Sequence, residues 1–164
     1  MAEGVERPIV FPLSNPTERI EAMPADVLAW TSGKALCAVG IPVSPVRLDG
    51  TTYTIGQANN ALLYPGLGLG TIVAGAEHVT DHMLLAAADA VASQVTSSQL
   101  GAPLLPPVEN LRPSSAIVAG AVIRAAVADG VARADLGDVS DDSQLVRRVQ
   151  DAMWQPIYLD AGSR

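Results

Sequence analysis

Cysteine is almost absent from this chain, since Cys37 is the only one among 164 residues. A single cysteine cannot form an intrachain disulfide, the usual reinforcement of small secreted domains. The amino terminus, MAEGVERPIV, has neither the basic stretch nor the apolar core of a signal peptide. We therefore expect a cytoplasmic protein in which Cys37 fills part of a buried core.

Aromatic and charged residues are also scarce: the chain has one Phe, two Trp and three Tyr, and 16% of its residues are charged. Hydrophobic residues make up 49%, a globular composition that gives one ordinary domain a core of Ala, Val, Leu and Ile. The formal net charge of −7 disfavours nucleic acid and anionic membrane surfaces as partners.

Charge is missing altogether from residues 51–76. A membrane-spanning helix needs about 20 predominantly apolar residues. The apolar part, 61–76, is shorter and is interrupted by proline and glycine, so we predict a buried helix over about 62–76. Each glycine in a helix costs about 1 kcal/mol relative to alanine. We expect close packing against a neighbouring backbone to offset the cost of Gly66, Gly68, Gly70 and Gly75.

The first third of the chain predicts an α/β fold with a parallel sheet. Apolar runs at 8–13 and 34–39 have the length of buried strands, and Pro24 and Gly33 delimit a helix between them. A strand, a helix and a strand form a right-handed βαβ unit. The Asp49-Gly50 pair then predicts a hairpin.

The second half predicts helices. Thr80 is placed to cap a helix over 81–95, and a proline-rich connector follows at 101–113. Ser114 or Ser115 is then expected to cap a helix that runs to about Asp129. The last predicted helix, over 141–154, is amphipathic and is ended by Pro156.

Neutral amides mark the candidate site. Gln57, Asn59 and Asn60 precede the glycine-spaced helix, and Asn15 follows the first strand. A carboxamide donates and accepts hydrogen bonds, so it can hold a hydroxyl or a carboxylate without adding charge. In open α/β sheets ligands bind at the carboxyl ends of strands. The alternative is structural, with Asn59 and Asn60 capping the helix and Asn15 forming an Asx turn.

Two other patterns carry less weight. The Gly66-Leu-Gly68-Leu-Gly70 run is GxGxG within an apolar helix, whereas a dinucleotide loop requires GxGxxG after a strand. His78 and His82 have metal-binding spacing, but no third ligand is nearby in the sequence. We interpret the glycines as helix packing and predict no metal site in this chain.

Five segments together resemble the C-terminal half of malic enzymes, in order and in spacing, and the resemblance covers nearly the whole chain. They are ERPIVFPLSNPTERIEA, the strand before Gly40-Ile41-Pro42, GQANNALLYPGLGLG, AEHVTDHMLLAAADAVA and the final MWQPIY. The resemblance implies that residues 1–76 form the C-terminal part of a Rossmann-like NAD(P)-binding domain and residues 77–164 a helical C-terminal region packed on it. It also implies oxidative decarboxylation of malate to pyruvate with NAD or NADP and a divalent metal, Mg or Mn.

Site residues follow from the resemblance position by position. It implies that Asn15, Asn59 and Asn60 contact the substrate. It implies that Ser14, Asn15, Gly40 and Asn60 line the cofactor. The chain departs from the family at two places, since Ile41 and Ala58 stand where Ser and Gly are usual.

The family's Tyr and Lys acid/base pair, its metal ligands and its GxGxxG loop lie upstream of the region that resembles this chain. We therefore expect a fragment that is inactive alone, has no catalytic residue of its own, and needs the N-terminal half as a partner, with a homo-oligomer as its state. Two alternatives stay open. One is a non-catalytic module that binds a dicarboxylate or nucleotide, and the other is a structural module whose helices mediate self-association.

Overall fold

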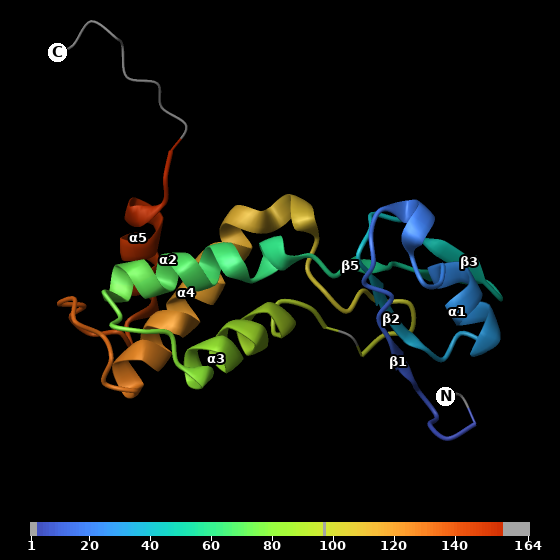
Figure 1. Ribbon diagram of the computed structural model, residues 1–164, viewed down its shortest axis with the longest axis horizontal. Helices are drawn as coiled ribbons and strands as arrows, with labels where there is room; N and C mark the ends of the chain where they lie inside the picture. The colour runs from blue at the N-terminus through green and yellow to red at the C-terminus, as the bar shows by residue number, and fades with distance from the viewer. Residues whose placement is uncertain (1–2, 97, 156–164) are drawn as a thin grey trace, which may run out of the picture.

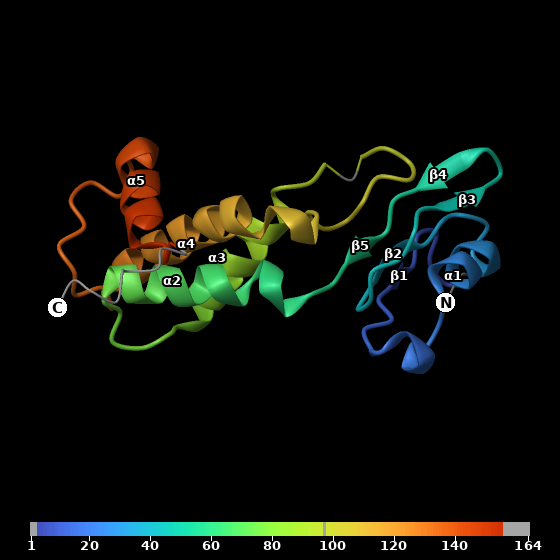
Figure 2. The same ribbon diagram turned by 90° about the horizontal axis from the view of Figure 1, so that it is seen from above.

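The computed structural model describes residues 3–96 and 98–155. Figures 1 and 2 show an elongated molecule with the strands and the first helix at one end and the longer helices at the other. Residues 156–158 of the MWQPIY segment and the predicted stop at Pro156 lie outside the described residues. The elements in chain order are β1 (Ile9–Val10), η1 (Thr17–Arg19), α1 (Pro24–Trp30), β2 (Leu36–Val39), β3 (Val46–Leu48), β4 (Thr51–Tyr53), β5 (Gly56–Gln57), η2 (Asn60–Leu62), α2 (Tyr64–Ala74), α3 (Asp81–Ala92), η3 (Val108–Asn110), α4 (Leu111–Ala128) and α5 (Asp142–Ala152), where η marks short 3-10 turns.

The predicted parallel sheet is present, with strand order β1-β2-β5 and β2 in the centre. Its buried side chains Cys37 and Val39 pack with Val27 of α1, so the lone cysteine is a core residue as expected. Burial raises the pKa of the Cys37 thiol, because desolvation disfavours the thiolate. The predicted hairpin at Asp49-Gly50 is also present, as the antiparallel pair β3–β4.

The strand β5 was not predicted from the sequence. β5 consists only of Gly56 and Gln57, which pair in parallel with Ala38 and Val39 of β2. Two residues are too few to show a hydrophobic period. Their strand conformation comes from the neighbouring β2, which no local pattern can report.

The helical end is organised around α4, which packs against α2 and α3, while α5 lies across the far end (Figures 1 and 2). Its core is aliphatic, as the composition predicted, and includes Leu67, Met83, Val122, Ile123 and Val149. One stretch among the described residues, Val108–Ala128, has the length and composition of a membrane span, with a mean hydropathy of 1.3. Half of that window is buried within the structure, as expected of the central helix of a bundle.

Two of the glycines of α2 lie against the backbone of α4, as predicted. A Cβ added to Gly66 would lie 2.9 Å from the carbonyl oxygen of Ser115, and one added to Gly70 would lie 2.8 Å from the carbonyl oxygen of Ala119. Gly68 is different, because nothing lies within 4 Å of its added Cβ. The close-packing explanation therefore holds for Gly66 and Gly70 and is wrong for Gly68.

The start of α4 also differs from the prediction. The helix begins at Leu111, so Ser114 and Ser115 are buried inside its first turns instead of capping it. Pro113 is tolerated there because the first N–H groups of a helix have no intrahelical partner. The prediction that Pro113 belongs to the extended connector is therefore wrong.

The buried residues form two separate clusters. One belongs to the sheet with α1, and the other, which begins at Leu62 and includes α2, belongs to the helical bundle. The glycine-spaced helix thus packs with the helical end, and the chain crosses from sheet to bundle just after Asn59 and Asn60. The domain boundary after residue 76 stays a prediction.

Candidate functional site

A cavity lies where the sheet meets the bundle, and we call it the amide cavity. Its volume is about 610 Å³. It is lined by Phe11, Leu13, Asn15, Gly40, Ala58, Asn59, Asn60, Leu62, Leu63, Tyr64, Ala88, Val91 and Leu105. Four of the five predicted site residues therefore share one cavity, although they are spread over some 45 positions of sequence.

Parallel strands bring these residues together. Asn15 follows β1, Gly40 follows β2, and the two asparagines follow β5, so all come from the carboxyl ends of neighbouring strands. The Asn15–Pro16 peptide bond is cis. The four residues therefore lie at the carboxyl edge of the parallel sheet, which is where open α/β sheets bind ligands.

Glycine is required at position 40, because the backbone segments that follow β1 and β2 approach each other closely there. The Gly40 N–H donates to the carbonyl oxygen of Pro12 at 2.9 Å. A Cβ at this position would lie 2.3 Å from the carbonyl oxygen of Leu13. The segments leaving β1 and β2 therefore touch here, and any larger residue would separate Asn15 from the rest of the cavity.

The asparagine pair is held by short hydrogen bonds on either side. Ala58 N–H donates to the Val39 carbonyl at 2.7 Å, and Asn59 Oδ1 accepts from Ala61 N–H at 2.9 Å. The glycine-spaced helix α2 has no side-chain cap, so the structural alternative is wrong about which helix is capped. Asn59 instead caps η2 through its side-chain oxygen. Its carboxamide nitrogen can still donate to a ligand. No such cap is made by Asn60, whose side chain is exposed at the cavity.

Gln57 ties the strand ends to each other. Its Nε2 donates to the carbonyl oxygen of Gly40 at 3.2 Å, across the β2–β5 pair. The sequence grouped Gln57 with the asparagines, but its position relative to Gly40 depends on a strand pairing that no pattern revealed. Its side chain holds the cavity wall together.

Ser14 lies apart from the cavity lining. Its hydroxyl donates to Glu21 Oε1 at 2.5 Å and its N–H to Glu21 Oε2 at 3.2 Å. These bonds lower the pKa of the Glu21 carboxyl, with the Ser14 hydroxyl as the largest cause. The cofactor contact of Ser14 stays a prediction.

Part of the cavity lining is apolar and comes from elements that the sequence did not connect with the site. Ala88 and Val91 come from α3, and Leu105 comes from the connector before η3. Among the described residues that line the cavity, none is charged. The cavity can therefore hold a ligand that combines polar groups with an apolar ring or chain.

One histidine of the pair, His82, contacts a carboxylate of the bundle. His82 Nδ1 lies 2.8 Å from Asp129 Oδ1, and Thr80 Oγ1 donates to Asp129 Oδ2 at 2.5 Å. These two bonds lower the pKa of the Asp129 carboxyl, and the Thr80 bond is the larger cause. Within residues 3–96 and 98–155, no three His, Cys, Asp or Glu side chains gather at one place.

Comparison with known proteins identifies the family. The family model described as the malic enzyme NAD-binding domain matches residues 1–127. The chain belongs to the malic enzyme family. Its parallel sheet and helices are accordingly part of a Rossmann-type NAD-binding domain, as the resemblance implied.

Two relatives of the chain both carry NAD in their names. The chain is 54% identical over 158 residues to the putative malate oxidoreductase [NAD] of Mycobacterium tuberculosis, covering 96% of this chain and 28% of that protein. It is 49% identical to NAD-dependent malic enzyme 3 of Bacillus subtilis, covering 96% of this chain and 27% of that protein.

Solved malic enzymes share the fold. The enzyme from Pyrococcus horikoshii superposes with a TM-score of 0.64 at 29% identity, covering 87% of this chain and 29% of that one. The Entamoeba histolytica enzyme gives 0.65 at 25% identity, covering 88% of this chain and 27% of that one. The chain thus spans little more than a quarter of the length of the malic enzymes it matches.

Proposed function

We propose that the amide cavity forms one wall of the malate- and NAD-binding site of an NAD-dependent malic enzyme, which oxidatively decarboxylates malate to pyruvate. The observation that carries the proposal is the convergence of Asn15, Gly40, Asn59 and Asn60 on one uncharged cavity at the carboxyl ends of parallel strands. Its volume of about 610 Å³ is ordinary for a small-molecule site.

The roles follow from the chemistry of each group. Malate offers a hydroxyl and two carboxylates, which carboxamide N–H groups of Asn15 and Asn60 can hold without a counter-charge. Gly40 and Asn60 would lie along the nicotinamide end of the cofactor, and the apolar wall from α3 would exclude water from it. When bound, NAD accepts the hydride that malate loses on oxidation.

The chain would supply binding and orientation, with the reacting groups coming from the remainder of the enzyme. The described residues bring no metal ligand set together, so the residues present do not fit Mg or Mn by themselves. We expect the 164-residue chain to bind ligand without turning malate over.

Titration calorimetry of the chain with NAD, NADP and malate tests the proposal. Removing a hydrogen bond to a charged group costs about 1.5–3 kcal/mol. Asn15→Ala and Asn60→Ala should therefore weaken binding by about tenfold or more. Asn110→Ala is the matched control, because Asn110 is exposed and makes no side-chain cap where it precedes α4.

Asn59→Ala is a poorer choice, because it would also remove the cap of η2. A wild-type chain that gives no binding heat with any of the three compounds would overturn the proposal. So would an Asn110→Ala chain that loses as much affinity as the other two variants. Preference for NAD over NADP is read from the same titrations.

A further inference from the structure

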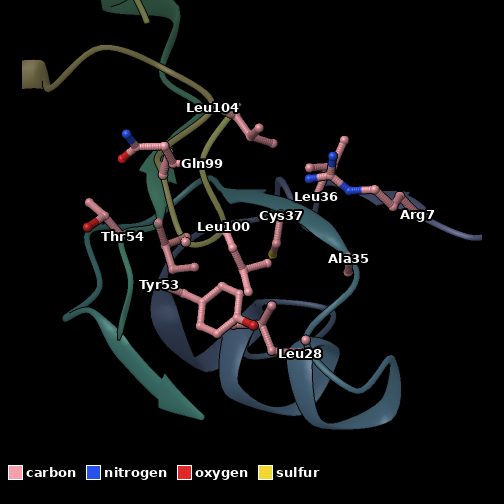
Figure 3. A pocket seen from close by; sticks show the side chains of 14 residues that line it. Arg7, Leu28, Ala35, Leu36, Cys37, Tyr53, Thr54, Gln99, Leu100 and Leu104 are labelled. Carbon is pink, nitrogen blue, oxygen red and sulfur yellow. The ribbon is translucent and has the colours of Figure 1, made fainter. Parts of the chain in front are cut away.

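Residues 98–107 form a connector that runs from the helical end to the sheet and then back to η3 and α4 (Figure 2). Figure 2 shows it running out beside β4 and β5 and back to α4. Figure 3 shows Leu100 of this segment between Cys37 of β2 and Tyr53 of β4. The space left beneath it is only about 20 Å³, room for one water molecule at most. The connector therefore covers the sheet closely.

Gly101 attaches the connector to the short segment between β4 and β5. Its carbonyl oxygen accepts from Thr54 N–H at 2.9 Å. Its φ of +83° favours glycine, and an added Cβ would lie 2.3 Å from the carbonyl oxygen of Thr52. Even alanine at this position would force the connector and β4 apart.

Leu105 attaches the same connector to β5 itself. A Cβ added to Gly56 would lie 3.1 Å from both Leu105 Cβ and Leu105 N, so the two backbones are in close contact. Leu105 also packs against the bundle core and lines the amide cavity. The sheet, the bundle and the cavity meet at this one side chain.

From these contacts we infer that the connector, through Gly101 and Leu105, is a brace that positions β5 and thereby Asn59 and Asn60. β5 pairs with β2 through two residues only, and so short a pairing needs support from its other side. Leu105 is a positioning residue that acts through Gly56, and Gly101 is one that acts through Thr54, two residues before β5. Their effect on malate and NAD rests on the proposed function.

Nuclear magnetic resonance of the chain tests the brace without any ligand. Gly101→Ala and Leu105→Ala should shift the backbone amide signals of residues 57–60. Gly50→Ala is the matched control, since Gly50 has a φ of +79° but nothing within 4 Å of an added Cβ. Gly50→Ala introduces comparable backbone strain, but at the turn of the β3–β4 hairpin and away from the connector, so it should leave the signals of residues 57–60 in place. Leu105→Met, which nearly conserves volume, should restore them.

Calorimetry with NAD measures whether the brace affects the affinity for the cofactor. Displacement of the asparagines should weaken binding about tenfold in Gly101→Ala and Leu105→Ala, with Gly50→Ala unchanged. If Gly101→Ala does not fold, the test is the comparison of Leu105→Ala with Leu105→Met. Signals of residues 57–60 that stay at wild-type positions in folded Leu105→Ala would overturn the brace. A wild-type chain that binds no NAD would overturn the proposed function instead, while the signal shifts still report on the brace.

Discussion

The three glycines at alternate positions in α2 allow one sharp test, because the same substitution should have opposite effects. Gly66 and Gly70 face α4, whereas Gly68 faces outward with nothing within 4 Å of an added Cβ. Replacing each by alanine changes helix propensity by the same amount, about 1 kcal/mol in favour of the helix. Any difference among the three variants therefore comes from packing.

The magnitude follows from the distances. An added Cβ at Gly70 would lie 2.8 Å from Ala119 O and 2.8 Å from Val122 Cβ, and at Gly66 the nearest atom is 2.5 Å away. Backbone atoms of α4 cannot yield as a flexible side chain can, so overpacking should cost about 3 kcal/mol, the upper end of its usual range. The net prediction is a loss of about 2 kcal/mol for Gly66→Ala and Gly70→Ala and a gain of about 1 kcal/mol for Gly68→Ala.

Thermal and urea unfolding followed by circular dichroism at the helix band measures these changes. For a chain of this size, 1 kcal/mol corresponds to roughly 2–4 °C in Tm. Gly68→Ala should therefore melt a few degrees above the wild type and Gly70→Ala several degrees below it. Equal Tm values for the three variants, or a Gly68→Ala chain less stable than the wild type, would refute the packing argument.

Three further predictions concern the cap of α3, the acid response and the strand ends. Thr80→Ala should lower the free energy of unfolding by about 1 kcal/mol, because Thr80 Oγ1 accepts from Met83 N–H, and Thr80→Ser should restore it in urea unfolding. The folded-state pKa of Asp129 lies below its usual value, so the stability it contributes is present above about pH 4 and is lost as pH falls through the folded pKa. Asp129→Asn should thus destabilise the chain at pH 6 and converge with the wild type in strong acid; parallel pH curves would contradict this. Gly40→Ala, whose Cβ would lie 2.3 Å from Leu13 O, should cost about 2 kcal/mol and weaken NAD binding in calorimetry, whereas Gly68→Ala should leave binding unchanged.

Most of the elements could be predicted from the sequence, because their signals are local. The hairpin follows from Asp49-Gly50, α3 from its Thr80 cap, and the small core of the sheet from short apolar runs. The amide motif and the family could also be recognised, since they are properties of residue order alone.

The tertiary structure decided everything that depends on pairs of distant residues. It made Gly56 and Gln57 a strand, because β2 lies beside them, and it assigned the oxygen of Asn59 to a cap. It separated Gly68 from the two glycines that pack on α4, although all three occur in one repeating pattern. Leu105 joined the cavity only because the connector returns to the sheet. Local patterns determine what each segment can form, whereas the surroundings of each side chain depend on contacts between segments far apart in sequence.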